Sequence, residues 1–207
     1  MSGDKHNPSE APPAKPGGLV PLGRRPCPLC GDGTLLRPLF PVEIPWDSVD
    51  FLRTTRVEPI AELHLVECET CGLSFAAEDF PRDVILGFYQ RDVTPEEHFA
   101  GREDKHAIFH FILDGCRVPR GRLLDVGSFS GSLMFEARQA GWQVQGVDIN
   151  RRYVAFCRER LGFEVFLGFL EEANFPDGHF DAVTMIDVLE HLRDPLETLR
   201  EVRRVLR

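Results

Sequence analysis

The sequence lacks a long apolar run, an apolar leader and an excess of positive charge. No stretch approaches the ~18 consecutive apolar residues of a membrane-spanning helix, so we expect no membrane partner. The N-terminal segment MSGDKHNPSEAPPAKPGG is polar and has no apolar core of the kind that a signal peptide needs. These absences predict a cytoplasmic protein in a reducing compartment, where structural disulfides are rare.

Negative charge dominates, because 33 Asp and Glu residues outnumber 24 Lys and Arg residues and give a net charge of −9. This balance disfavours a nucleic-acid partner that is held by general electrostatic attraction. The 207 residues, of which 43% are hydrophobic, suffice for one ordinary domain and a small module.

The character of the chain changes three times along its length. Residues 1–23 are polar and rich in Pro and Gly, which predicts a disordered tail. Residues 24–78 contain prolines and short alternating runs that favour a small β-rich module, and residues 79–118 read as a helical linker or lid. Residues 119–207 alternate strand and helix patterns, which predicts an α/β fold with a parallel sheet and right-handed crossovers.

Four of the six cysteines form two C-x-x-C-G pairs, Cys27 with Cys30 and Cys68 with Cys71. A two-residue gap lets two thiolates face one ion, and four thiolates close a tetrahedral, structural Zn²⁺ site. The alternative is a pair of disulfides or unligated thiols. His64 could compete as a ligand, although we expect it on a strand face.

The stretch LLDVGSFSGSLM, residues 123–134, reads as a strand that enters a helix through Gly127 and Gly131. The middle glycine of a dinucleotide-binding turn is absent and Phe129 occupies the loop, so the ligand should be less phosphate-like. A free amino-acid end would suit the turn: Asp125 attracts an ammonium group, and the helix N-terminus favours a carboxylate. The alternative is a tight turn without a ligand.

Asp148 ends the next strand, about 20 residues after Gly127, where an acidic residue can accept hydrogen bonds from ribose hydroxyls. Taken alone, Asp148 could be a turn residue or a helix cap. Together with the first turn it indicates a ligand with an amino acid at one end, a ribose at the other and no phosphate between them. That description fits S-adenosylmethionine.

The segments LLDVGSFSGSLM, VQGVDIN, FPDGHFDAVTMIDVLEHLRDP and REVRRVLR resemble class I S-adenosylmethionine-dependent methyltransferases, in particular the ubiquinone-type branch. The resemblance covers residues 121–207 and implies a partial Rossmann-like sheet with strand order 3-2-1-4. It also implies a cofactor-binding set, in which Asp125, Gly127 and Gly131 hold the methionine part, Asp148 the ribose and Ile149 the adenine.

The resemblance further places Asp187 beside the transferred methyl group. His191 is a candidate proton acceptor at neutral pH, with loop orientation as the alternative that we favour. The acidic residue that many relatives have at the adenine edge is replaced by Phe169, so Glu171 or a backbone group must take that contact. The lid segment offers His98, Arg102 and His106, although a solvated helix face is the alternative that we favour there.

The cysteine pairs ahead of this domain resemble the zinc-binding module of bacterial sugar C-methyltransferases, and also the zinc-bearing arm of ribosomal RNA guanine methyltransferases. We expect a small-molecule substrate, either a sugar or a biosynthetic intermediate. The alternatives are a non-catalytic interaction protein and an RNA methyltransferase. The family's fifth strand does not follow the last helix pattern, so we expect a fragment whose fourth strand is an open sheet edge. The oligomeric state and the accepting atom stay open.

Overall fold

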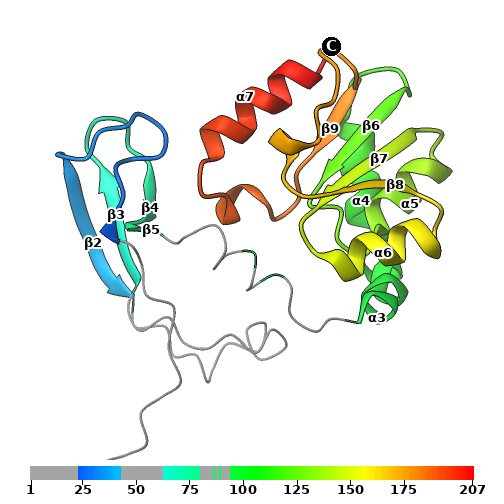
Figure 1. The fold of residues 1–207 in the computed structure, drawn as a ribbon, viewed down its shortest axis with the longest axis horizontal. Helices are drawn as coiled ribbons and strands as arrows, with labels where there is room; N and C mark the ends of the chain where they lie inside the picture. The colour runs from blue at the N-terminus through cyan, green and yellow to red at the C-terminus, as the bar shows by residue number, and fades with distance from the viewer. Residues whose placement is uncertain (1–22, 43–62, 80–85, 87–88, 90–93) are drawn as a thin grey trace, which may run out of the picture.

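The computed structural model describes residues 23–42, 63–79, 86, 89 and 94–207 (Figure 1). Residues 1–22 of the predicted tail lie outside the described residues. So do most of residues 81–90, where the sequence has a short helix pattern. Figure 1 shows a small β module near the N-terminus and a larger domain in which helices cover a sheet. No helix among the described residues is long and apolar enough to cross a membrane.

The β module contains two short antiparallel sheets. Strands β2 (Leu36–Val42), β3 (Leu63–Cys68) and β4 (Ser74–Ala76) pair in the order β2-β3-β4, and β1 (Gly23–Arg24) pairs with β5 (Glu78–Asp79). Its own small core consists of the following buried residues: Cys27, Val66, Cys68, Phe75 and Ala77. Because two of these five are cysteines of the paired motifs, the module has little apolar area with which to fold without a further crosslink.

The lid segment forms two helices joined by a 3₁₀ turn: α3 (Pro95–Ala100), η2 (Gly101–Lys105) and α4 (His106–Gly115). The sequence pattern suggested a break at Gly101, and the helix does change there. Thr94 is the N-cap of α3, but its side chain does not accept a backbone hydrogen bond. Its hydroxyl instead donates to Glu97 Oε2 at 2.6 Å, so the capping box expected there is wrong.

Four parallel strands form the larger sheet: β6 (Arg122–Val126), β7 (Gln143–Asp148), β8 (Glu164–Leu167) and β9 (Ala182–Thr184). Their order is β8-β7-β6-β9, which confirms the α/β class and the predicted order 3-2-1-4. β6 is buried from Leu123 to Val126 because helices pack on both faces, as parallel sheets require.

Helices α5 (Ser132–Gln139) and α6 (Arg151–Glu159) follow β6 and β7, and α7 (Pro195–Val205) follows β9. Leu123 and Ala182 contribute to a core with α4 and α5, on one face of the sheet. Leu124 and Val147 contribute to a second core that includes Val205 of α7, on the other face. Two short 3₁₀ turns, η3 (Leu170–Glu172) and η4 (Leu189–His191), complete the domain.

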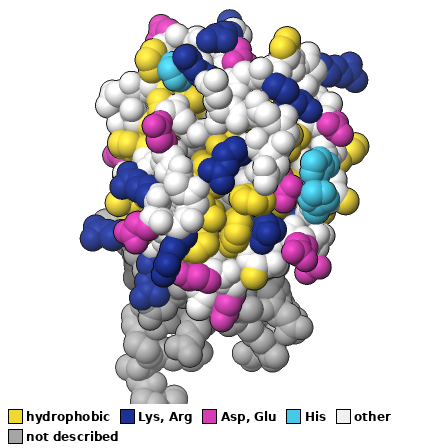
Figure 2. All heavy atoms as spheres, turned by 90° about the vertical axis from the view of Figure 1, so that its right-hand side faces the viewer, with side chains coloured by type: hydrophobic (Ala, Val, Ile, Leu, Met, Phe, Trp, Pro, Cys, Tyr) yellow, Lys and Arg dark blue, Asp and Glu magenta, His cyan; other side chains and the backbone are white. Residues whose placement is uncertain are grey.

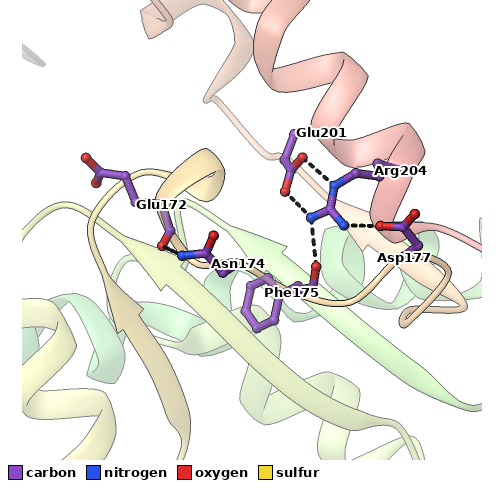
Figure 3. Close-up of polar contacts among 6 residues, drawn as sticks. All are labelled: Glu172, Asn174, Phe175, Asp177, Glu201 and Arg204. Carbon is purple, nitrogen blue, oxygen red and sulfur yellow. Dashed lines mark hydrogen bonds and ion pairs between the residues drawn. The ribbon is translucent and has the colours of Figure 1, made fainter.

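Helix α7 begins as the sequence predicts but buries a different stripe. Asp194 Oδ1 accepts a hydrogen bond from the Glu197 amide at 3.0 Å, which caps the helix. The residues that become buried are Thr198 and Val205, whereas Leu199, expected in the apolar stripe, is 41% exposed. Figure 3 shows how Arg204 holds the helix: its guanidinium contacts Glu201, Asp177 and the Phe175 carbonyl.

At the edge of the sheet that was expected to be open, the chain pairs with a residue just ahead of β9. The chain returns after α7, and Leu206 forms a parallel bridge with Phe180 just ahead of β9. The Phe180 amide donates to the Val205 carbonyl at 2.9 Å, and the Arg207 amide donates to the Phe180 carbonyl at 3.0 Å. Phe180 is therefore already paired, whereas β9 itself is the edge strand of the described sheet and pairs with β6 alone, as expected.

Candidate functional site

The four cysteines of the two pairs converge in the β module. Their sulfur atoms all lie within 4.8 Å of one another, although they come from two loops far apart in the sequence. The Sγ atoms of Cys27 and Cys71 are 3.5 Å apart, as are those of Cys30 and Cys68. All four are free thiols in this structure, so no disulfide bond joins them here.

Each cysteine pair has the same turn. The Gly31 amide donates to the Cys27 carbonyl at 2.9 Å, and the Gly72 amide donates to the Cys68 carbonyl at 2.7 Å. Both glycines have φ of 78°, a left-handed conformation that other residues adopt only with strain. The glycine after each pair is thus needed to bring the two thiols of its loop toward one point.

The electrostatics of these thiols favour a bound cation. Burial raises the pKa of Cys68, but amide donors from Cys71 and Thr70 and the Cys30 thiol lower it to about 7. The amide of Asp32 favours the Cys30 thiolate, yet desolvation and the neighbouring thiols raise that pKa to about 12. One thiolate forms readily and its neighbours then resist ionisation, so all four can ionise together only around a positive ion.

His64 does not join the cysteines. Its Nδ1 lies 2.6 Å from Oε1 of Glu78, and its amide donates to the same oxygen at 2.9 Å. Glu78 is 7% exposed, so this contact compensates a buried carboxylate between β3 and β5. The structure thus gives His64 a structural role, in agreement with the expectation that it belongs to a strand.

The glycine turn after β6 has the backbone that its sequence requires. Gly127 and Gly131 have φ of 72° and 75°. A Cβ built on Gly127 would lie 2.4 Å from Cγ2 of Val188, and one on Gly131 would lie 2.9 Å from Sγ of Cys157. Neither position has room for a side chain. Gly127 therefore lets the loop after β9 approach the turn, in addition to leaving its own backbone accessible.

Asp125 lies at the carboxyl end of β6 and is 4% exposed. Its Oδ1 accepts a hydrogen bond from the Thr184 hydroxyl of β9 at 2.7 Å. Burial raises the pKa of Asp125 to about 7, the Thr184 bond opposes the rise, and the nearby charge of Asp148 adds to it. A buried carboxyl group of this kind gains stability as an anion when a cation binds next to it.

Asp148 lies at the same end of the neighbouring strand β7 and is 9% exposed. Its two oxygens accept backbone hydrogen bonds, Oδ2 from the Phe129 amide and Oδ1 from the Asn150 amide, both at 2.7 Å. Burial raises the pKa of Asp148, against these hydrogen bonds. The carboxylate therefore joins the glycine turn to the start of α6.

Phe129 lies within the glycine turn and packs outward against two helices. Its ring stacks on His98 of α3 at a centroid distance of 4.8 Å and contacts Tyr153 of α6 at 4.2 Å. The Tyr153 hydroxyl lies 2.5 Å from Nδ1 of His98. The sequence indicated His98 only as a candidate in the lid segment, and it did not predict the contacts of His98 with Phe129 and Tyr153. The contacts place α3 beside the turn.

Tyr89 and Asn150 are further site residues that the sequence analysis missed. Asn150 caps α6 through its Oδ1, which accepts from the Arg152 amide at 2.9 Å, and its Nδ2 donates to the Tyr89 carbonyl. Burial raises the pKa of Tyr89 to about 12, with smaller contributions from Glu190 and Asp148. Asn150 could have been found from the sequence, because it is a polar residue that directly follows Asp148 and Ile149 at the strand end.

His191 lies in η4, next to Tyr89, with a centroid distance of 6.1 Å between their rings. It is exposed, and its amide donates to the Val188 carbonyl at 2.9 Å. Asp187 is also exposed and has φ of 52°. The sequence pattern suggests a strand that continues to Val188, but β9 ends at Thr184. Both residues therefore belong to a loop beyond the strand, not to its tip.

In the segment after β8, the Glu171 carboxylate accepts a hydrogen bond from the Thr198 hydroxyl of α7. The adenine contact expected from Glu171 or a backbone group stays a prediction. Glu172 accepts from the Phe169 amide at 2.9 Å. Ile149, the predicted adenine neighbour, is half-buried. A hollow of about 400 Å³ lies elsewhere, along β7 and β8, and none of the predicted site residues line it.

Buried carboxylates at the ends of two adjacent parallel strands, together with a glycine turn, are typical of Rossmann-like α/β domains. A family described as "Methyltransferase domain" matches residues 124–207. This match agrees with the resemblance to class I S-adenosylmethionine-dependent methyltransferases that the sequence shows.

Curated relatives agree with this family. A ubiquinone biosynthesis O-methyltransferase of Xanthomonas campestris is 29% identical over 145 residues, which are 61% of this chain and 61% of that protein. A ubiquinone/menaquinone biosynthesis C-methyltransferase of Methylobacterium nodulans is 36% identical over 94 residues, 41% of this chain and 37% of that protein. The chain thus spans well under two thirds of the length of these relatives.

Solved structures are also similar. A SAM-dependent methyltransferase from Archaeoglobus fulgidus has a TM-score of 0.47 and 27% identity, and the match covers 54% of this chain and 52% of that one. The PH0226 protein from Pyrococcus horikoshii OT3 has a TM-score of 0.47 and 28% identity, with 51% and 53% covered.

Proposed function

We propose that the chain is the cofactor-binding part of an S-adenosylmethionine-dependent methyltransferase that acts on a small molecule. The observation that carries the proposal is the pair of buried carboxylates, Asp125 and Asp148, at the carboxyl ends of β6 and β7 inside the matched family domain. When bound, S-adenosylmethionine supplies a methyl group on a positively charged sulfur. Methyl transfer needs positioning and exclusion of water more than it needs acid or base catalysis.

The residues of the site suit the parts of that cofactor. Burial raises the pKa of Asp125 to about 7, so its carboxylate would hold the ammonium group of the cofactor, beside Gly127 and Gly131, above that pH. Asp148 would accept a hydrogen bond from a ribose hydroxyl with the acceptor capacity that its backbone donors leave. Ile149 offers apolar surface for adenine.

The loop after β9 would close the other side of the site. Asp187 and His191 are exposed there, and His191 adjoins Tyr89. We retain His191 as a candidate proton acceptor for an acidic substrate group. Its alternative role is to orient the loop, since its amide donates a hydrogen bond to the Val188 carbonyl.

The substrate is proposed as a small molecule, a sugar or a biosynthetic intermediate. Support for a small molecule comes from relatives whose names refer to ubiquinone biosynthesis. The four converging thiols would hold one structural Zn²⁺, because four sulfur ligands leave no open coordination position for chemistry. Stable thiolate ligation fits the cytoplasmic location that the sequence suggests.

The pKa of Asp125 provides a direct test of cofactor binding. A cationic ligand binds the ionised carboxylate, so protonation below pH 7 should weaken S-adenosylmethionine binding by up to about tenfold per pH unit. Titration calorimetry between pH 5.5 and 8 measures this dependence. Asp125→Asn should bind weakly and lose the dependence below pH 7. An affinity that stays constant across this range in the unaltered chain would contradict the role of Asp125.

Turnover is tested separately. Formation of S-adenosylhomocysteine should appear when the protein meets the right member of a panel of sugars and phenolic or quinone precursors. Transfer to RNA with no transfer to any small molecule would overturn the substrate class. Binding of the cofactor with no transfer to any acceptor would favour a non-catalytic role.

A further inference from the structure

A second cluster of metal-ligating side chains lies outside both sites described above. His106 and His110 are one turn apart on α4, and Glu136 faces them from α5. The ligand atoms of the three residues all lie within 4.8 Å of one another. Figure 2 shows a face of the molecule on which two histidine side chains touch each other beside an acidic side chain.

The three side chains converge on one point. Oε2 of Glu136 lies 3.1 Å from Nδ1 of His106 and 3.5 Å from Nε2 of His110. Around a tetrahedral Zn²⁺ with bonds of about 2.0–2.1 Å, neighbouring ligand atoms are about 3.3 Å apart. Both measured separations match that value, so an ion needs little movement of the side chains to enter.

The burial of the three residues is unequal in a way that favours a cation. The side chain of Glu136 is 10% exposed, whereas those of His106 and His110 are 57% and 41% exposed. A nearly buried carboxylate is costly without a positive partner. One divalent ion would compensate this carboxylate and bind both imidazole rings, whose centroids are 4.2 Å apart.

We propose that His106, His110 and Glu136 form a binding site for a divalent transition-metal ion of the zinc type, with solvent in the remaining coordination positions. Two imidazoles and a carboxylate are ligands that zinc accepts. The site is independent of the four-cysteine cluster, because the two involve different residues and different parts of the fold. It does not rest on the proposed methyltransferase activity.

The proposed ion would tie the lid segment to the domain. α4 follows α3, whose His98 stacks on Phe129 of the glycine turn, and α5 is the helix that follows this turn. A metal bridge from α4 to α5 would therefore fix both helices near the turn. We expect bound metal to protect the segment from Thr94 to Gly115 against proteolysis.

The test is a metal titration of the full chain whose four-cysteine site has first been filled with zinc. Added Co²⁺ should bind as one further equivalent, with weak visible bands of nitrogen and oxygen ligation and no thiolate charge-transfer band. His106→Asn/His110→Asn should lose this equivalent or bind it at least tenfold more weakly. Glu136→Gln should also weaken it. His179→Asn, which removes a half-buried histidine outside the cluster, should bind as the unaltered protein does.

Replacement of His106 and His110, whose side chains are 57% and 41% exposed, should leave the fold intact, and circular dichroism checks this point. Loss of the second equivalent in the double variant with an unchanged spectrum supports the site. Equal cobalt binding by the double variant and the unaltered chain, or no second equivalent in either protein at millimolar metal, would overturn it.

Discussion

At the scale of single residues, the two buried aspartates accept hydrogen bonds from different parts of the domain. Asp125 contacts another strand through Thr184, whereas Asp148 accepts hydrogen bonds from the glycine turn and from the start of α6. Both carboxyl groups have raised pKa values because burial disfavours their charge. The domain thus holds two partly suppressed negative charges at one sheet end, which a cationic ligand with hydroxyl groups can use.

The proposed ribose contact of Asp148 can be measured. Asp148→Ala should weaken S-adenosylmethionine binding by about 1.5–3 kcal/mol, the range for hydrogen bonds to a charged group. Calorimetry with the unaltered chain and the variant gives the difference. Asp114→Asn, on the exposed surface of α4, serves as the matched control and should leave the affinity unchanged. If Asp148→Ala binds as tightly as the control, the residue serves only the turn and the helix.

At the scale of elements, the strand-to-helix turn depends on space as well as on backbone conformation. Gly127 has φ of 72° and a neighbour, Val188, where a Cβ would be, whereas Gly141 has φ of 91° and nothing within 4 Å. The two glycines therefore separate the cost of a left-handed backbone from the cost of a steric clash.

Gly141→Ala should lower the free energy of unfolding by about 1–2 kcal/mol through backbone strain alone. Gly127→Ala should lower it further, since Val188 and its loop must also move. Urea denaturation of the three proteins measures both effects. Equal losses in the two variants would show that Val188 moves aside freely and that close approach of its loop is not a requirement of Gly127.

At the scale of the whole molecule, the β module and the larger domain have separate cores and meet through polar contacts of Arg193. Residues of the module form their own cluster, distinct from those on the two faces of the parallel sheet. Arg193, which follows η4, makes a two-pronged ion pair with Asp79 of β5, with both N–O distances 2.8 Å. Arg25 donates to the Arg193 carbonyl at 2.7 Å.

Metal removal should affect the two parts unequally. The protein as purified without added metal should carry one tightly held zinc, and Cys68→Ser should lower that content. A strong chelator should unfold residues 23–79 and leave the parallel sheet folded, because the module has few buried apolar residues of its own. Elemental analysis and hydrogen exchange measure these outcomes. A metal-free protein with a protected module would refute the zinc site.

The Arg193–Asp79 pair should contribute modestly to stability. Arg193→Ala should lower the free energy of unfolding by less than about 1 kcal/mol, because the Arg193 side chain is 48% exposed and the ion pair is screened by solvent. A double-mutant cycle with Asp79→Ala isolates the coupling. The same variant should increase proteolysis of the chain between the module and the domain. A coupling well above this value would mean that the contact is a major link between them.

The sequence by itself determined the alternation of strands and helices, the paired cysteines and the acidic strand ends. These follow from local patterns, since apolar runs, capping residues and turn glycines act over a few neighbours. Only the tertiary structure decided that Thr198 and Val205 of α7 are buried, that Glu171 turns to α7 and that Leu206 pairs with Phe180. It alone joined Phe129 to His98, and His106 and His110 to Glu136, because those contacts depend on how distant helices pack, which no local pattern records.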